Sequence, residues 1–325
     1  MNNFWKDLPK PLFILAPMYD VTDAAFRRMF ARYGKPDVLV TEFVSADGLV
    51  SAGYEKLKHH LIFSKVERPI VAQIFGANPT NFTKAAKLLS DLGFDGIDIN
   101  MGCPEKNVVK QGACSALFKN PKLAQKVVMA TKTGAPNLPV SIKIRIGDIK
   151  VDWHDWIKAL LEAKPDAITI HLRTRKEKSL VPAHWEDMPK IMDFVKANSP
   201  EGFRPLIIGN GDIKSLEDAF HKIKTSGCDG VMIGRGAFGN PFFFNRTTPW
   251  DSLPLEQRFN IIVEHVKLFE ELLPGKNFEV MKKHFKAYIE GFPGASELRN
   301  ELYKALNASD VEPILENWLS NHPKV

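Results

Sequence analysis

The chain has 325 residues, of which 44% are hydrophobic and 25% are charged, as is usual for a soluble globular protein. No apolar run reaches membrane-spanning length and the N-terminal segment lacks a secretory signal pattern, so we expect a cytoplasmic protein that makes no membrane contact. The formal net charge of +6 permits a polyanionic partner without requiring one. The three cysteines have no zinc-ligand spacing and their odd number argues against a disulfide framework, so we expect no metal site.

Strand-like apolar runs alternate with segments of helical periodicity over most of the first 247 residues. The predicted strands cover residues 13–16, 38–43, 70–75, 97–100, 140–144, 167–171, 205–209 and 230–233. Predicted helices follow a cap at Thr22 or Asp23 and the Asn78-Pro79 pair, and others cover 122–133 and 153–163. Eight such β-then-α units predict a (β/α)8 TIM barrel. An open doubly wound sheet is the alternative, which the absence of a G-x-G-x-x-G motif after the first strand disfavours.

The residues after about 248 lack strand-like alternation. Residues 255–273, 278–290, 295–308 and 311–319 have helical spacing, and glycines separate several of these segments. We therefore predict two domains, a barrel catalytic domain over residues 1–247 and a small C-terminal helical domain over residues 248–325.

Polar and glycine residues recur where the predicted strands end, which is the end of a (β/α)8 barrel that carries the active site. They are Pro17-Met18-Tyr19, Glu42, Gln73, Asn100 and Cys103, Lys143 and Arg145, His171 and Arg173, Asn210-Gly211-Asp212, and Gly234-Arg235. Each has an unremarkable alternative when taken alone: Asn210-Gly211 is a common turn, Lys143 could face solvent, and His171 could be a core histidine. Their shared register on successive strands favours a common site.

The polar and glycine residues at the strand ends are the groups that binding of flavin mononucleotide (FMN) requires. Backbone N–H groups at Gly211, Gly234 and Arg235 can hold a phosphate where a loop meets a helix N-terminus. Gln73 can bond the amide edge of an isoalloxazine ring, and Lys143 can place positive charge near the part of the ring that becomes anionic on reduction.

Residues 96–121 contain the most distinctive stretch, a buried strand that ends in Asn100-Met101-Gly102-Cys103-Pro104. Pro104 biases Cys103 toward an extended backbone, so this cysteine lies in a loop. A small buried hydrophobe is the ordinary alternative for a free cysteine.

The stretch resembles the signature of the tRNA-dihydrouridine synthase family, and the resemblance extends over roughly residues 11–300. The matching motifs are Ala16-Pro17-Met18, Gln73, the N-x-G-C-P loop, Lys143-Ile144-Arg145-Ile146-Gly147, His171-Leu172-Arg173-Thr174-Arg175, Asn210-Gly211-Asp212, Gly234-Arg235-Gly236-Ala237, and Lys283-His284 with Tyr288. Two positions depart from the pattern: Cys114 stands where the family usually has glycine, and Leu172 stands where a small residue is more usual.

The resemblance implies that the chain reduces the C5–C6 bond of uridines in tRNA, with FMN recharged by NADPH or NADH. Hydride would pass from flavin N5 to C6, and Cys103 would protonate C5. The implied FMN contacts are Pro17, Met18, Tyr19, Gln73, Lys143, His171, Asn210, Gly211, Asp212, Gly234 and Arg235. We expect Cys103 to keep a pKa near its unperturbed value of about 8.5, so that it is protonated at neutral pH.

The resemblance also implies a tRNA substrate. Asn100 would bond the uracil edge, and Arg173 and Arg175 would belong to a basic loop that contacts phosphates, with further lysines in the loop after Cys103 and in the helical domain. A solvated surface is the alternative for each basic cluster taken singly. We expect a monomer.

Two other functions remain open on the sequence. An FMN-dependent barrel oxidoreductase acting on a free pyrimidine or an enone would use the same strand-end residues without needing basic loops. An RNA-binding protein with a vestigial barrel would bind tRNA without flavin, but it would have no reason to keep Gln73, Lys143, His171 and Cys103 together.

Overall fold

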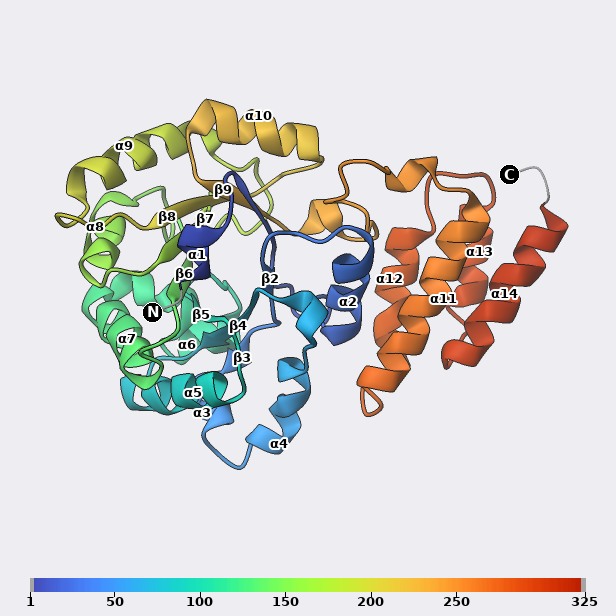
Figure 1. The fold of residues 1–325 in the computed structure, drawn as a ribbon, viewed down its shortest axis with the longest axis horizontal. Helices are drawn as coiled ribbons and strands as arrows, with labels where there is room; N and C mark the ends of the chain where they lie inside the picture. Colours follow the sequence, from blue (N-terminus) through green and yellow to red (C-terminus); the bar gives the residue numbers. More distant parts are fainter. Residues whose placement is uncertain (1–2, 323–325) are drawn as a thin grey trace.

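The computed structural model describes residues 3–322, which form a barrel of parallel strands and a group of four helices beside it (Figure 1). The strands are β1 (Leu12–Leu15), β2 (Leu39–Val40), β3 (Val44–Ser45), β4 (Ile70–Phe75), β5 (Gly96–Asn100), β6 (Val140–Arg145), β7 (Ala167–His171), β8 (Leu206–Asn210) and β9 (Gly230–Ile233). The helices of the barrel part are α1 (Phe4–Asp7), α2 (Ala24–Tyr33), α3 (Ala46–Leu49), α4 (Tyr54–Leu57), α5 (Pro79–Asp91), α6 (Lys106–Lys110), α7 (Pro121–Gly134), α8 (His154–Glu162), α9 (Met188–Asn198) and α10 (Leu216–Ser226). The helices beside the barrel are α11 (Leu255–Leu272), α12 (Met281–Tyr288), α13 (Ala295–Leu302) and α14 (Ala308–Asn321).

The strands confirm the predicted barrel. Their order around the sheet is β1-β9-β8-β7-β6-β5-β4-β2, with every pair parallel. The ring closes between β1 and β2, where Ile14 bridges to Val38 and the Leu15 N–H donates to the Val38 carbonyl at 3.2 Å. All carboxyl ends therefore open on one face of the barrel, which collects the residues that follow each strand.

The second strand differs from its prediction. Residues 38–43 were expected to form one strand, but β2 ends at Val40 and β3 begins at Val44. The Gln73 N–H donates to the hydroxyl of Thr41 at 3.1 Å. A side-chain oxygen thus takes a bond that a backbone carbonyl would accept in a regular ladder. Glu42 lies in this break, and its carboxylate accepts the N–H of Asp20.

Side-chain caps start α2 and α5 where the sequence predicts them, and a further cap starts α7. The carboxylate of Asp23 accepts the Phe26 N–H at 3.0 Å and starts α2. Asn78 and Asn120 cap α5 and α7, each followed by a proline. A proline suits the first helical position because its missing N–H would have no partner there.

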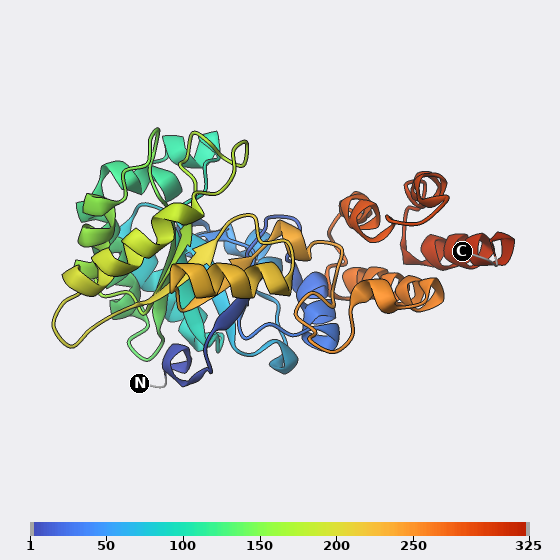
Figure 2. The ribbon, with the colours of Figure 1, turned by 90° about the horizontal axis from the view of Figure 1, so that it is seen from above.

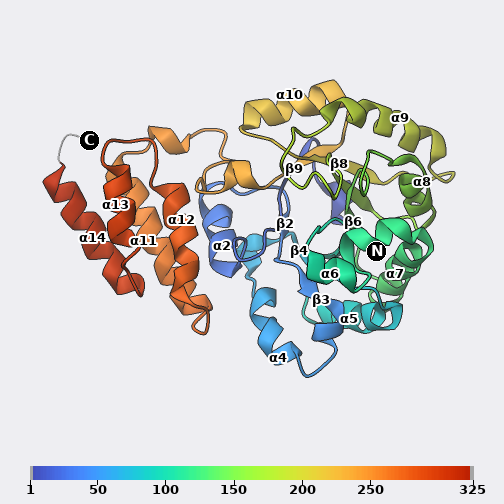
Figure 3. The same cartoon turned by 180° about the vertical axis from the view of Figure 1, so that it is seen from behind.

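The four helices α11–α14 form a group on one side of the barrel, where α11 packs against α2 (Figures 1 and 3). Ala25 and Met29 of α2 share a buried apolar cluster with side chains of these helices. On the surface Glu264 of α11 pairs with Arg32 and accepts the hydroxyl of Tyr33. Seen from above, the helical part extends away from the barrel and makes the molecule elongated (Figure 2).

The connection between the two parts includes Gly239, which has φ +85°. A Cβ at this position would lie 2.3 Å from the Ala287 carbonyl oxygen. Only glycine allows both this backbone conformation and this close approach to α12. The boundary predicted between residues 247 and 248 lies farther along this connection, before α11.

The helical part departs from its prediction at one point. Residues 295–308 were expected to form a single helix, but α13 ends at Leu302 and α14 begins at Ala308. Asn307 causes the break, because its side chain accepts the Asp310 N–H at 3.2 Å and so starts a new helix.

The Lys283-His284 and Tyr288 motif lies at the junction of the two parts. His284 and Tyr288 are buried, and the Tyr288 hydroxyl is 3.2 Å from Nδ1 of His265. Burial holds the pKa of His284 well below its usual value. These two residues therefore contribute to packing, and Lys286 is the exposed lysine of this helix. Within residues 3–322, no helix has both the length and the apolar character that crossing a bilayer requires.

Candidate active site

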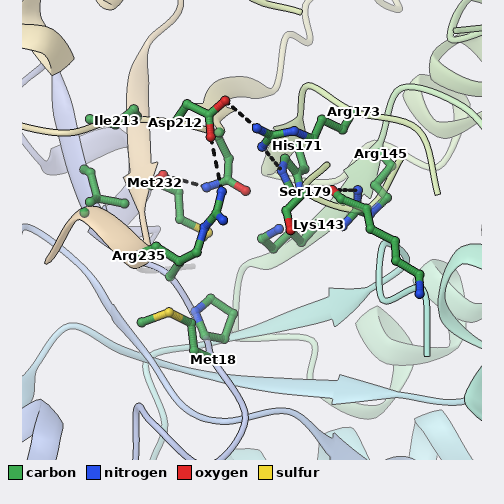
Figure 4. A pocket seen from close by; sticks show the side chains of 18 of the residues that line it. Met18, Lys143, Arg145, His171, Arg173, Ser179, Asp212, Ile213, Met232 and Arg235 are labelled. Carbon is green, nitrogen blue, oxygen red and sulfur yellow. Dashed lines mark hydrogen bonds and ion pairs between the residues drawn. The ribbon is translucent and has the colours of Figure 1, made fainter. Parts of the chain in front are cut away.

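A cavity of about 540 Å³ lies at the carboxyl ends of the strands (Figure 4), within the usual size of small-molecule sites. It is lined by Ala16, Pro17, Met18, Pro104, Lys143, Arg145, His171, Arg173, Lys178, Ser179, Asn210, Gly211, Asp212, Ile213, Lys214, Met232, Ile233, Gly234, Arg235 and Gly236. Of the predicted site residues, the structure thus brings into this cavity Pro17, Met18, Lys143, His171, Arg173, Asn210, Gly211, Asp212, Gly234 and Arg235. Tyr19, Gln73, Asn100, Cys103 and Arg175 do not line it.

The loops after β8 and β9 form one wall of the cavity. Gly211 has φ +131°, and a Cβ there would lie 2.7 Å from Cβ of Ala183. The indole of Trp185, which was not predicted, donates to the Gly211 carbonyl at 2.8 Å and anchors the turn. Main-chain N–H groups in glycine-containing turns suit an anion, and Arg235 adds a positive charge.

Asp212 organises this wall. Its carboxylate accepts a hydrogen bond from Arg173 and the Ala183 N–H, and it lies 3.2 Å from Arg235 (Figure 4). Burial opposes ionisation, but the hydrogen bonds from Arg173 and Ala183 hold the pKa of Asp212 below its ordinary value. The carboxylate therefore neutralises part of the local positive charge and orients both arginines.

Arg173 is placed differently from its predicted role in an exposed basic loop. It is 2% exposed, and besides Asp212 it donates to the Val181 carbonyl at 2.6 Å and to Nε2 of His171 at 3.2 Å. Arg175 is half-buried and pairs with Asp148. Both guanidinium groups therefore hold the loop after β7 in place.

Lys143 and His171 form the floor of the cavity with Arg145. Within residues 3–322 the Lys143 ammonium has no hydrogen bond and no ion pair, and burial together with the nearby Arg145 charge lowers its pKa to about 8. Burial and the charges of Lys143 and Arg145 keep the pKa of His171 well below its usual value, so its imidazole is neutral. An unpaired cation aimed into a cavity is poised to meet an anionic or electron-rich ligand.

Arg145 ties two loops across this floor. It donates to the Gly102 carbonyl at 2.7 Å and to the carbonyls of Thr174 and Lys178 at 3.0 Å each. The sequence placed Arg145 at a strand end without giving it a role. The sequence did contain a signal that Arg145 faces the same side as Lys143. The two residues are two positions apart, and alternate residues of a strand point to the same side.

Gln73 and Asn100 lie beneath the cavity wall in a buried network. The Gln73 amide donates to Asp98 at 2.7 Å and accepts from Asn100 at 3.0 Å. The Asn100 side-chain oxygen accepts the N–H groups of Gly102 and Cys103, both at 3.0 Å. Asn100 thus shapes the turn that presents Cys103, which is a different task from the uracil contact that we predicted.

Cys103 is partly exposed beside Pro104, which lines the cavity. The expectation of an unperturbed thiol is wrong: the pKa of Cys103 is lowered to about 6. A hydrogen bond with Cys114 is the largest cause, and the Glu105 N–H and the Arg145 charge act in the same direction against burial. Burial raises the pKa of Cys114 well above its usual value, so the proton shared by the two thiols resides mainly on Cys114.

Tyr19 faces two neighbouring grooves instead of the cavity. It is 56% exposed and lines both a groove of about 300 Å³ with Phe43 and Phe75 and one of about 830 Å³ with lysines 56, 58 and 276. Aromatic faces beside cationic side chains are a common feature of single-stranded nucleic-acid sites.

Lys276 connects the helical part to this region. It follows α11, and its ammonium lies 3.4 Å from carboxylate oxygens of Asp20 and Asp23 and 4.0 Å from one of Glu42. Burial opposes its charge, but these carboxylates raise the pKa of Lys276. Because Asp20 directly follows Tyr19, this ion cluster positions the exposed aromatic ring.

The residues of the cavity match the chemistry of a phosphate-bearing aromatic cofactor. The β8 and β9 loops provide an anion cradle, and Lys143 provides an unpaired cation on the opposite side. Pro17 and Met18 add an apolar wall between them.

Comparison with known proteins gives concordant results. The chain matches the family described as dihydrouridine synthase (Dus) over residues 14–322. It is 38% identical over 321 residues to a probable tRNA-dihydrouridine synthase 2 of Bacillus subtilis (strain 168), covering 98% of this chain and 97% of the relative. It is 39% identical to a probable tRNA-dihydrouridine synthase of Staphylococcus aureus (strain COL), with 98% and 96% covered.

Solved structures support the fold at low sequence identity. A 2-naphthoyl-CoA reductase bound to 2-naphthoyl-CoA superposes with a TM-score of 0.55 at 11% identity, over 72% of this chain and 49% of that chain. A histamine dehydrogenase from Rhizobium sp. 4-9 superposes with a TM-score of 0.52 at 14% identity, over 79% and 48%.

Proposed function

The chain belongs to the dihydrouridine synthase family, and from this membership we infer that it is an oxidoreductase that reduces the C5–C6 double bond of uridine in tRNA. The observation that carries the proposal is the cavity at the barrel mouth, where an anion cradle and an unpaired lysine flank a space that opens beside a reactive cysteine. Family membership supplies the substrate class, and the cavity supplies a place for the cofactor that such a reduction needs.

We assign the cavity to FMN, recharged by NADPH or NADH. The phosphate would lie against the N–H groups of Gly211, Gly234 and Arg235, where the charge of Arg235 helps to hold it. Lys143 would face the ring and favour its reduced, anionic form, while neutral His171 would avoid adding a second charge there. When bound, the flavin supplies the hydride that the uracil ring receives at C6.

Cys103 donates the proton that C5 requires. Asn100 holds the N–H groups of the Cys103 turn, so the thiol sits at the cavity rim on a fixed backbone. Because its pKa is lowered to about 6, Cys103 is mostly thiolate at neutral pH and donates through its protonated fraction, which grows as the pH falls. The stacked uracil base would exclude water, so the proton would pass from Cys103 to C5 and not to solvent.

The tRNA would reach the site across the exposed lysines at the barrel mouth. Lys106 and Lys110 follow the Cys103 loop, and Lys176 and Lys178 follow β7. Within residues 3–322 these four side chains form no ion pair with a carboxylate, which leaves them available for phosphates. A uridine in folded tRNA must leave its stack to reach Cys103, at a cost of a few kcal/mol that phosphate contacts can offset. The rival substrate, a free pyrimidine or enone, would gain nothing from such a surface.

The decisive experiment incubates the purified protein with FMN, NADPH and an unmodified tRNA transcript, and then maps dihydrouridine by position. We expect reduction of a uridine in the tRNA. If neither the transcript nor native tRNA gave a product, and free uracil or an enone were reduced, the protein would be an oxidoreductase that acts on small molecules.

Binding of tRNA should depend steeply on salt. About four phosphate contacts from the lysines named above would weaken the affinity on the order of 100-fold between 50 and 200 mM salt. Filter binding or fluorescence anisotropy at several salt concentrations measures this slope. An affinity that does not change over that range would show that these lysines do not contact the tRNA.

Replacement of Lys276 by methionine should raise KM for tRNA by about tenfold or more, because it removes the cation beside the carboxylates of Asp20 and Asp23. Reduction of the flavin by NADPH should change little, since the cavity is untouched. Lys276→Arg should restore most of the loss because it keeps the charge. Lys267→Met is the matched control, because Lys267 lies in α11 and pairs with Glu312 on the surface; an equal effect there would show that Lys276 has no particular role.

A further inference from the structure

Cys103 and Cys114 are held against each other by two loops at the mouth of the barrel. Cys114 begins the short helix Cys114–Lys119. The next residue, Ser115, donates to the Cys103 carbonyl from its hydroxyl at 2.8 Å and from its N–H at 3.4 Å. These two bonds hold the backbones of Cys103 and Cys114 side by side. Each cysteine also shifts the pKa of the other, so the two thiols interact.

The backbone at Cys114 favours a different residue. Cys114 has φ +52°, in the left-handed region, two residues after Gly112 with φ +75°. A residue with a side chain is strained in this conformation, which glycine adopts freely. The chain nevertheless carries a thiol there, beside the loop of the proposed proton donor.

The two thiols differ in access and in protonation. Cys103 is partly exposed at the cavity rim, whereas Cys114 is fully buried. The pKa of Cys103 is lowered to about 6 and that of Cys114 is raised. An accessible thiolate next to a buried protonated thiol is the arrangement in which the first reacts with an oxidant and the second can then resolve the product.

We propose that Cys103 and Cys114 form a peroxide-sensitive modification site, in which Cys103 is oxidised by hydrogen peroxide and then joined to Cys114 in a reversible disulfide. In the first step the Cys103 sulfur attacks the peroxide: an S–O bond forms, the O–O bond breaks, and hydroxide leaves and takes up a proton as water. In the second step the Cys114 sulfur attacks the Cys103 sulfur: the S–S bond forms, the S–O bond breaks, and the hydroxyl leaves with the Cys114 proton as a second water. The two thiols lose two electrons and the peroxide gains them.

The consequence for activity rests on the proposed function of Cys103 as proton donor. The disulfide removes that donor and stops turnover, and a dithiol restores it. Rapid disulfide formation also spares Cys103 from the irreversible sulfinic acid that a lone sulfenic acid would reach in excess peroxide.

The first test is chemical and needs neither tRNA nor turnover. The full-length protein is treated with a small excess of hydrogen peroxide, its remaining thiols are blocked, and it is digested with trypsin without reductant. Cleavage after Lys87, Lys106, Lys110 and Lys119 places Cys103 in peptide 88–106 and Cys114 in peptide 111–119. We expect these two peptides joined, at a mass two hydrogens below their sum, and separated again by dithiothreitol.

Two variants sharpen this test. Cys114→Gly should give no joined peptides and should instead carry sulfinic acid at Cys103. Cys228→Ser is the matched control, because Cys228 is buried beside Ser226, away from the pair, and its loss should leave the joined peptides unchanged. Sulfinic acid at Cys103 of the wild-type chain, without the joined peptides, would overturn the proposal.

Activity provides the second readout. Dihydrouridine formation by the wild-type protein should fall at least tenfold after peroxide and return with dithiothreitol, whereas Cys114→Gly should lose activity without recovering. Joined peptides in a protein that keeps full activity would separate the modification from the catalytic role of Cys103. The disulfide could then be real even if the proposed function of this residue failed.

Discussion

Replacing Cys103 with alanine is expected to lower kcat for dihydrouridine formation by about 10²- to 10⁴-fold, the usual contribution of a positioned general acid. The reason is that C5 then has to take its proton from water, which the bound substrate excludes. Flavin binding and flavin reduction by NADPH should stay close to wild type, because Cys103 does not line the cavity that we assign to the flavin.

The measurement combines single-turnover dihydrouridine formation with the visible flavin spectrum. Cys228→Ala is the control, since this cysteine is buried in the barrel wall, where it donates to the Gly230 carbonyl. A Cys103→Ala protein that loses its yellow colour would indicate a structural cysteine. A variant with undiminished kcat would exclude the proton-donor role.

The activity of the wild-type enzyme should also depend on pH through the protonation of Cys103. The protonated form of Cys103 is needed for donation, and its pKa is lowered to about 6. Activity should therefore be highest below pH 6 and should fall by up to tenfold per pH unit above it. In Cys114→Gly the pKa of Cys103 should rise, because the hydrogen bond that lowers it most is gone, and the decline should move to higher pH.

Replacing Arg27 with methionine is expected to lower the free energy of unfolding by about 3–5 kcal/mol, since it strands a buried carboxylate. The Arg27 guanidinium is fully buried and donates to Glu67 at 2.8 Å, to the Thr22 carbonyl at 2.8 Å and to the Ile62 carbonyl at 2.6 Å. Oε2 of Glu67 and the two carbonyls would lose this donor, while Oε1 of Glu67 keeps its bonds from Ser64.

Urea unfolding followed by circular dichroism measures this loss. Arg32→Met is the control on the same helix, because the Arg32 side chain is 62% exposed where it pairs with Glu264, and exposed pairs contribute about 1 kcal/mol or less. Equal losses in both variants would show that burial of Arg27 adds nothing. The effect should reach the helical part, because α2 carries Arg27 on one part of its surface and packs with α11–α14 through Ala25 and Met29.

Much of the barrel and its site could be predicted from the sequence, because the relevant signals are local. The β4, β7 and β9 strands have the predicted bounds or nearly so, since an apolar run between turn residues determines a buried parallel strand. Lys143, His171, Asn210 and Gly234 meet in one cavity because each lies at or near the carboxyl end of a strand, and parallel strands of a barrel end on the same face.

The errors arose where a side chain from elsewhere in the chain competes with the local pattern. The second strand breaks because the Thr41 hydroxyl takes the Gln73 N–H. Arg173 appeared to belong to an exposed basic loop, yet it is buried against Asp212, 39 residues away. Asn100 is a different case, because its side chain bonds the N–H groups of Gly102 and Cys103 in a local turn, and that turn occupies the oxygen that we had assigned to uracil.

The sequence by itself determined the fold class, the family and the set of residues at the barrel mouth, because hydrophobic period, turn residues and motif spacing are written along the chain. Only the tertiary structure decided the protonation of Cys103, the placement of the arginines and the contact of Lys276 with the barrel. A pKa or an ion pair depends on burial and on charges a few ångströms away, and those distances exist only after residues far apart in sequence have packed together.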